Sequence, residues 1–183
     1  FFTSGCSENA TLPTQTLTPN NRVVNIEGDI PSIDLLNEKA KPIVELKGVE
    51  EAKEELERLY GIKVLIVQAD VNAGADNEAV VGEVVKQTMD TFGRIDVLIN
   101  NAQASASGVT LADHTTDQFN LAMYSGLYAA FYYMKACYPY LKEAQGSVIN
   151  FASGAGLFGN FGQCAYAAAK EGIRGLSRVA AKE

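Results

Sequence analysis

Two short stretches decide the fold of this chain, Ser147-Val-Ile-Asn-Phe-Ala-Ser153 and Tyr166-Ala-Ala-Ala-Lys170. The first is an apolar run that closes on a serine, which is typical of a strand buried in a sheet. The second lies in an alanine-rich segment that favours a helix, where a spacing of four places tyrosine and lysine on one face. A tyrosine hydroxyl titrates near pKa ~10, and an ammonium held beside it favours the phenolate. Ser153, Tyr166 and Lys170 therefore indicate proton transfer to or from an alcohol or carbonyl oxygen, which the serine would orient.

The same spacing occurs a second time in the chain. Tyr138 and Lys142 are also four residues apart, and Ser125 precedes Tyr138 by thirteen, as in the C-terminal set. However, Ser125 falls inside a helical apolar pattern rather than at a strand end. Pro139 also disfavours the helix that would align Tyr138 with Lys142. We therefore assign the chemistry to the C-terminal set alone.

The size and charge of the chain limit the number of domains and the kinds of partner that we expect. A chain of 183 residues that is 47% hydrophobic has the content of one globular domain, which we expect to span residues 1–183. A net charge of -7 and a pI near 4.8 argue against nucleic acid or an anionic membrane surface as a partner. No uninterrupted apolar run approaches the length of a membrane span, so we expect no membrane segment.

The few cysteines and the single histidine exclude several kinds of protein and site. The three cysteines, Cys6, Cys137 and Cys164, lack pair spacing and indicate reduced thiols of a cytoplasmic protein. The single histidine, His114, lies in a polar segment and is expected to be a solvated loop residue. One histidine argues against a Ser-His-Asp hydrolase and against a His-rich metal site, so we expect no metal.

Apolar runs and helical patterns alternate along the chain. The predicted strands are Val64–Val71, Ile95–Asn100 and Ser147–Ser153. The predicted helices are Glu78–Phe92, which Gly93 ends, a long helix that the capping box Thr115-Thr-Asp-Gln118 opens and that runs to about Cys137, and a helix from Tyr166. This order predicts an α/β fold with a doubly wound parallel sheet, covered on both faces. Ligands bind at the carboxyl ends of such strands, where Asp70, Asn100 and Ser153 stand.

These residues resemble a known family, the short-chain dehydrogenases/reductases. The resemblance rests on Asn100-Asn-Ala-Gln103 after one strand, Ser153 after the next, and Tyr166-Ala-Ala-Ala-Lys170 in that order. Asp70-Val71 is similar to the family's adenine-contacting position, and Gly162–Ser177 resembles its active-site helix nearly throughout. The similarity is dense from Gly61 to Glu183, and several ordered motifs together make it specific.

The resemblance implies a Rossmann-like fold and an oxidoreductase that uses NAD or NADP to interconvert a small-molecule alcohol and a carbonyl. In the family the tyrosine is the acid-base, the lysine assists it and binds the nicotinamide ribose, and the serine orients the substrate oxygen. These roles carry over to Tyr166, Lys170 and Ser153. The cofactor-binding residues implied are Glu27, Asp70, Val71, Asn100, Ala102, Tyr166 and Lys170. A homo-oligomer is expected for the full-length protein.

The chain departs from the family's pattern at the glycine-rich turn. The best register places Thr3–Ala10 on that turn, with Ser4, Glu8 and Ala10 where glycines belong. Glu27 would then end the second strand, Arg22–Glu27, and accept from a ribose hydroxyl, which favours NAD over NADP. The other reading is that this segment is irregular polar sequence and the match accidental. In the first register, the Glu8 carboxylate would repel the pyrophosphate, so we expect weak cofactor binding.

Two further departures concern Gln103, where the family has glycine, and Gly126, where it has a helix asparagine. The chain also lacks most of the family's first strand and its last two strands, so we expect an incomplete sheet and a piece of a longer protein. Two alternatives stay open: a non-catalytic relative that keeps the fold as a binding or scaffolding domain, and a flavodoxin-like or receiver-type domain. The paired Asn100-Asn101 and the Ser-Tyr-Lys order weigh against the latter.

Overall fold

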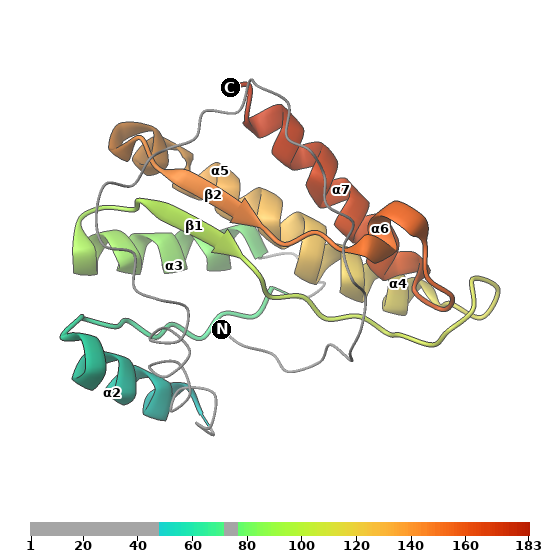
Figure 1. The fold of residues 1–183 in the computed structure, drawn as a ribbon, viewed down its shortest axis with the longest axis horizontal. Coiled ribbons are helices and arrows are strands. Elements are labelled where there is room, and N and C mark those ends of the chain that lie inside the picture. Colours follow the sequence, from blue (N-terminus) through green and yellow to red (C-terminus); the bar gives the residue numbers. More distant parts are fainter. Residues whose placement is uncertain (1–47, 72–76) are drawn as a thin grey trace, which may run out of the picture. The chain divides into compact units, whose positions relative to one another are not determined.

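The computed structural model describes residues 48–71 and 77–183, which fall into two units. One unit contains the described residues up to Ile66, and the other runs from Val67 to Glu183. The first holds helix α2 (Val49–Tyr60), which carries acidic residues in its first turn and ends at Gly61 in the left-handed conformation (Figure 1). The expectation of a single domain stays a prediction.

The predicted strand Val64–Val71 is wrong, because none of its residues is in a strand. Its first residue instead bonds to side chains of α2. The Val64 N–H donates to Glu57 Oε1 at 2.9 Å, and the Val64 carbonyl accepts from Lys53 Nζ at 2.9 Å. A strand exists only through hydrogen bonds to a neighbour, and the other strand predicted earlier in the chain, Arg22–Glu27, lies outside the described residues.

The second unit contains a parallel pair of strands, β1 (Val97–Asn100) and β2 (Ser147–Asn150). They pair in register, with Asn100 opposite Asn150 at their carboxyl ends. This confirms the predicted parallel crossover. The strands are shorter than predicted, because Ile95 and the residues from Phe151 to Ser153 lie outside the ladder.

Helices precede, join and follow these strands. They are α3 (Asn77–Phe92), α4 (Thr116–Ala122), the π-helical segment η1 (Met123–Tyr128), α5 (Ala129–Ala144), α6 (Gly154–Phe158) and α7 (Cys164–Ala180). Two local predictions are confirmed. Thr115 caps α4 in a capping box with Gln118, and Gly93 ends α3 with a left-handed φ of 73°.

One prediction about α5 is wrong. We expected Pro139 to disfavour the helix that aligns Tyr138 with Lys142, but α5 continues through Pro139 to Ala144. A proline within a helix removes one backbone hydrogen bond and is disfavoured by about 3 kcal/mol. The flanking side chains of Cys137 and Leu141 are both buried in the core, and this packing holds the helix on both sides of the proline.

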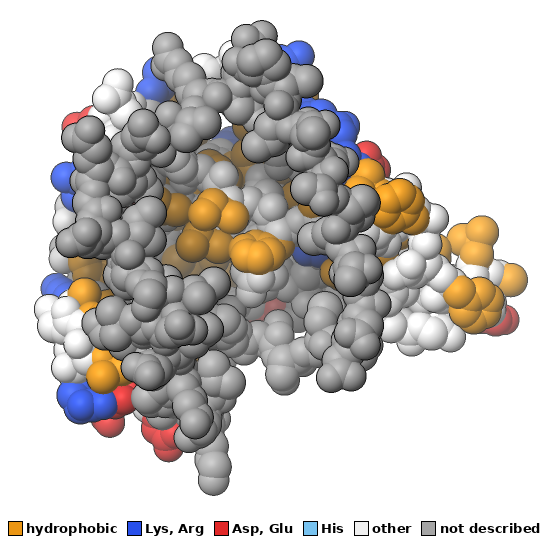
Figure 2. Space-filling view, in the orientation of Figure 1, with side chains coloured by type: hydrophobic (Ala, Val, Ile, Leu, Met, Phe, Trp, Pro, Cys, Tyr) orange, Lys and Arg blue, Asp and Glu red, His pale blue; other side chains and the backbone are white. Residues whose placement is uncertain are grey.

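The core lies between the strands and the helices α3 and α5, which Figure 1 shows behind the two strands. Its buried members are Val81, Val85, Ile95, Cys137 and Leu141. The opposite face of the sheet is open in this unit, since Val97 and Ile99 are 52% and 56% exposed. Figure 2 shows hydrophobic side chains on this near face. Open strand faces were expected because the sheet was predicted to be incomplete. Cover on both faces, which the doubly wound fold predicted, is not found among the described residues.

None of the helices described by the structure is long and apolar enough to cross a membrane.

Candidate active site

Helix α7 places Tyr166 in its first turn and Lys170 one turn later, as the spacing predicted. Lys170 Nζ lies 5.6 Å from the centroid of the Tyr166 ring and donates a hydrogen bond to the Phe151 carbonyl at 2.6 Å. The Lys170 side chain is only 5% exposed, and this burial lowers its pKa below the ordinary lysine value. The lysine is therefore fixed between α7 and the segment that follows β2.

Ser153 follows β2 and caps the N-terminus of α6. Its Oγ accepts a hydrogen bond from the Ala155 N–H at 3.2 Å, which holds the half-buried side chain in place. A serine hydroxyl that accepts one bond still has its own proton to donate. The convergence of Ser153 Oγ with the Tyr166 hydroxyl stays a prediction.

Gly156 brings α6 against α7 beside the lysine. A Cβ at this glycine would lie 3.0 Å from the backbone N of Glu171 and 3.3 Å from the backbone C of Lys170. Only a residue without a side chain permits this approach between two backbones. The N-terminus of α6, which Ser153 caps, and the turn of α7 that contains Lys170 therefore lie close together.

The second Tyr-x-x-x-Lys set also forms a pair in the structure. Lys142 Nζ donates to the Tyr138 hydroxyl at 3.1 Å and lies 5.3 Å from the ring centroid. Both of these side chains are exposed on α5, whereas Lys170 is buried. Spacing does not separate the two pairs, whereas burial does.

The carboxyl ends of the strands are joined by side-chain amides. Asn100 Nδ2 donates to Asn150 Oδ1 at 2.8 Å, and Asn150 Nδ2 donates to Ser177 Oγ on α7 at 2.9 Å. Sequence reasoning identified Asn100 but missed Asn150. An asparagine inside an apolar strand was the available signal, since a buried amide needs partners.

Three of the other predicted cofactor-binding residues are described by the structure. Asp70 and Ala102 are exposed, and Val71 packs at the margin of the core. Glu27 and the residues proposed for the glycine-rich turn lie outside the described residues.

The two departures from the family's pattern, Gln103 and Gly126, lie against each other. A Cβ at Gly126 would stand 2.6 Å from Cδ and Nε2 of Gln103, so the carboxamide occupies the space over the glycine. Gln103 Nε2 also donates to the Ala122 carbonyl, with a long separation of 3.4 Å. The Gln103 side chain is therefore folded onto the helix.

His114 is in a loop, as predicted, but it is not solvated. Both of its ring nitrogens are buried and have no hydrogen-bond partner among the described residues. The polar neighbours in sequence suggested a hydrated side chain, but they do not determine how the loop packs.

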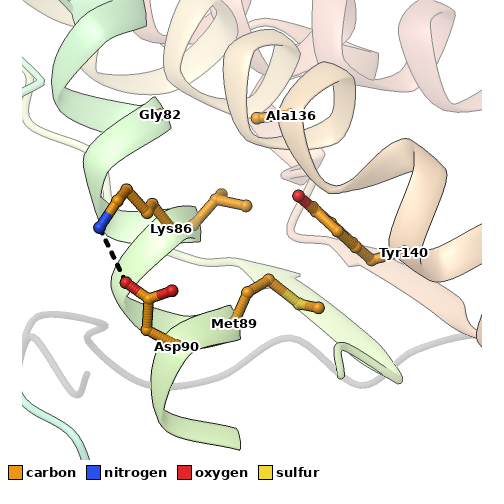
Figure 3. A pocket seen from close by; sticks show the side chains of 7 residues that line it. Gly82, Lys86, Met89, Asp90, Ala136 and Tyr140 are labelled. Carbon is orange, nitrogen blue, oxygen red and sulfur yellow. Dashed lines mark hydrogen bonds and ion pairs between the residues drawn. The ribbon is translucent and has the colours of Figure 1, made fainter. Parts of the chain in front are cut away.

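A cavity of about 330 Å³ lies between α3 and α5, away from Tyr166 and Lys170 (Figure 3). Met89 and Tyr140 face each other across it, and the ion pair of Lys86 with Asp90 lies at its edge. Of the predicted site residues that the structure describes, none lines this cavity.

Residues 33–183 match the family described as short chain dehydrogenase. Over 133 residues the chain is 71% identical to a 12alpha-hydroxysteroid dehydrogenase of Clostridium sp., an alignment that covers 73% of this chain and 51% of that protein. It is 39% identical over 124 residues to a 3-oxoacyl-(acyl-carrier-protein) reductase of Synechocystis sp., covering 67% of this chain and 48% of the relative. The chain thus spans about half the length of these relatives.

Solved structures show the same likeness. A short chain dehydrogenase from Mycobacterium avium superposes with a TM-score of 0.66 at 28% identity, covering 73% of this chain and 46% of the other. An NAD+-bound xylitol dehydrogenase also gives a TM-score of 0.66, at 27% identity, covering 73% of this chain and 50% of the other.

Proposed function

Since this chain belongs to the short chain dehydrogenase family, we propose that the protein is an oxidoreductase. It would interconvert an alcohol and a carbonyl with NAD or NADP. The observation that carries the proposal is the buried lysine one turn after a tyrosine, Lys170 after Tyr166, on a helix that follows the strand ending near Ser153. Burying an ammonium costs free energy that only hydrogen bonds or charge pairing offset, and groups whose pKa burial shifts cluster at functional sites.

The residues present fit a dinucleotide. An ammonium has three N–H donors, and one of those of Lys170 goes to the Phe151 carbonyl, which leaves donors for the hydroxyl groups of a ribose. Asn100 stands at the carboxyl end of a parallel strand, where ligands of such sheets bind. The cofactor, when bound, accepts or supplies the hydride. Asp70, Val71 and Ala102 are proposed to contact its adenosine part, and Glu27 a ribose hydroxyl, which favours NAD.

Each residue of the set has one proposed task. Tyr166 gives its proton to the substrate oxygen in reduction and takes it back in oxidation. Lys170 keeps a positive charge beside the tyrosine ring, which favours the phenolate that oxidation needs. Ser153 uses its own O–H to hold the substrate oxygen, because its Oγ is already fixed by the Ala155 N–H.

A hydroxysteroid is the substrate class that we propose first. The relative at 71% identity is named for a 12alpha-hydroxysteroid. Apolar side chains are exposed in the segment after Ser153 and in the loop before α4, where Figure 2 shows hydrophobic side chains gathered at the right of the view. The exposed large apolar residues of these two segments are Leu111 at 79%, Leu157 at 53%, Phe158 at 86% and Phe161 at 86%. Such a surface fits a bulky apolar alcohol better than a charged one.

We also propose a cytoplasmic location and a homo-oligomer for the full-length protein. A non-catalytic binding role is the second candidate, which the altered residues Gln103 and Gly126 favour.

Turnover tests the two candidates. The protein is incubated with NAD+ or NADP+ and secondary alcohols, a 12α-hydroxysteroid among them, and formation of reduced cofactor is followed by absorbance. We expect turnover that Ser153→Ala lowers by a factor of ~10² or more, and that Ser147→Ala, at the exposed start of β2, leaves unchanged. Cofactor binding without turnover of any alcohol would favour the non-catalytic role.

A further inference from the structure

Ser125 joins the segment after β1 to the helix that faces it. It is 4% exposed, and its Oγ accepts the Ala104 N–H at 3.0 Å. The same oxygen lies 2.6 Å from the Leu121 carbonyl and 3.1 Å from the Ala104 carbonyl. One hydroxyl proton serves one acceptor at a time, and the shorter distance assigns it to Leu121. Ser125 therefore bridges the backbone of Ala104 and the backbone of α4.

Gln103 makes the second connection at the same place. Its carboxamide covers Gly126 and donates to the Ala122 carbonyl, while its Oε1 is buried without a partner among the described residues. A polar group left without a partner is retained in a packed structure only where other contacts hold it. The amide is held by its contact with Gly126.

Both contacts fall on η1, a π-helical turn between two α-helices. Single turns of this kind are rare and are frequent at functional sites. The turn places two adjacent small residues, Ser125 and Gly126, both buried, against two adjacent residues of the segment, Gln103 and Ala104. A strand holds this segment on one side, at Asn100, and the helix holds it on the other.

We propose that Ser125 and Gln103 are positioning residues that lock the segment after β1 in its cofactor-binding shape. The inference rests on the proposed function, in which Asn100 and Ala102 bind the dinucleotide. Neither residue needs to touch the cofactor in this role. We call the contacts of Ser125 and Gln103 with this segment and the facing helix the clamp. The clamp fixes residues 103 and 104, so the backbone between β1 and the clamp has little conformational entropy left to lose when the cofactor binds.

The test compares Ser125→Ala with Thr88→Ala in the full chain. Thr88 is a matched control, because its Oγ1 bonds the Val84 carbonyl four residues earlier, as Ser125 bonds Leu121, whereas the Ala104 backbone groups bond Ser125. Hydrogen exchange at the Ala104 amide and titration with NADH and NADPH are measured for each protein. We expect faster exchange at Ala104 and a dissociation constant about two to twelve times higher for Ser125→Ala only, the range of one hydrogen bond. In turnover, KM for the cofactor should rise while kcat at saturating cofactor is kept.

A second variant guards against a folding defect. Gln103→Ala removes the half-buried Gln103 side chain and should also raise the dissociation constant for the cofactor. Unchanged exchange at Ala104 in Ser125→Ala would refute the clamp, and equal affinity in wild type and variants would refute its role in binding. A wild-type protein that binds neither cofactor would instead refute the proposed function and, with it, the role of the clamp.

Discussion

The contact between Gln103 and Gly126 predicts a coupling that a double-mutant cycle can measure. A Cβ at Gly126 would lie 2.6 Å from the Gln103 carboxamide, a distance at which one of the two groups must move. The atoms met are the far end of the flexible Gln103 side chain, which can shift, so the lower end of the overpacking range applies, about 1 kcal/mol. Replacing a helical glycine by alanine otherwise gains about 1 kcal/mol. We therefore expect Gly126→Ala to leave the free energy of unfolding of the wild type nearly unchanged.

A gain should appear when the carboxamide is absent. In the Gln103→Ala background, Gly126→Ala should stabilise the protein by about 1 kcal/mol, which gives a coupling of about 1 kcal/mol. Urea unfolding of the four proteins measures it. Gly82→Ala on α3 is the control, because nothing lies within 4 Å of a Cβ there, and its effect should be the same in both backgrounds. A coupling below about 0.5 kcal/mol, the usual error of additivity, would refute the contact.

Three more predictions follow from particular residues. Pro139→Ala restores an N–H that can bond the Lys135 carbonyl, so urea unfolding should show a gain of about 1–3 kcal/mol; a loss would mean that the ring is needed. Burial lowers the pKa of Lys170, so as the pH falls the unfolded chain binds the lysine proton before the folded chain does. The free energy of unfolding should therefore decline as the pH falls from 10.5, the ordinary lysine pKa, to the lowered pKa of Lys170. Lys170→Met should remove this decline in thermal scans across the same pH range. Burial raises the pKa of Cys137 to about 11, so iodoacetamide should label it far more slowly than Cys164, and equal labelling by peptide mapping would contradict its burial.

Local signals in the sequence predicted the elements that local chemistry determines. The capping box at Thr115 and the left-handed Gly93 are both set by neighbours within a few residues, and both are confirmed. Helix α7 and its Tyr166–Lys170 spacing belong to the same class. For these residues, sequence pattern and structure agree because no distant contact is required.

The wrong predictions involve contacts that are distant in the sequence. Pro139 lies in a helix because Cys137 and Leu141 are buried on either side of it, and this packing outweighs the local preference. The run that begins at Val64 is no strand, because a strand requires a hydrogen-bonded neighbour.

The Gln103–Gly126 contact was also beyond the reach of sequence pattern. Each residue looked like a separate departure, and only the fold brings the two together. The Asn150 link to Asn100 is of the same kind, since register across the sheet creates it.

The central claim is that Tyr166 with the buried Lys170 carries the chemistry and that the exposed pair, Tyr138 with Lys142, does not. The most direct test is the alcohol-dependent turnover of Tyr166→Phe and Tyr138→Phe, measured side by side in the full-length protein. We expect Tyr166→Phe to lose a factor of at least ~10², because it removes the proton donor, and Tyr138→Phe to stay within about twofold of wild type. Equal losses from the two substitutions, or a larger loss from Tyr138→Phe, would contradict the assignment.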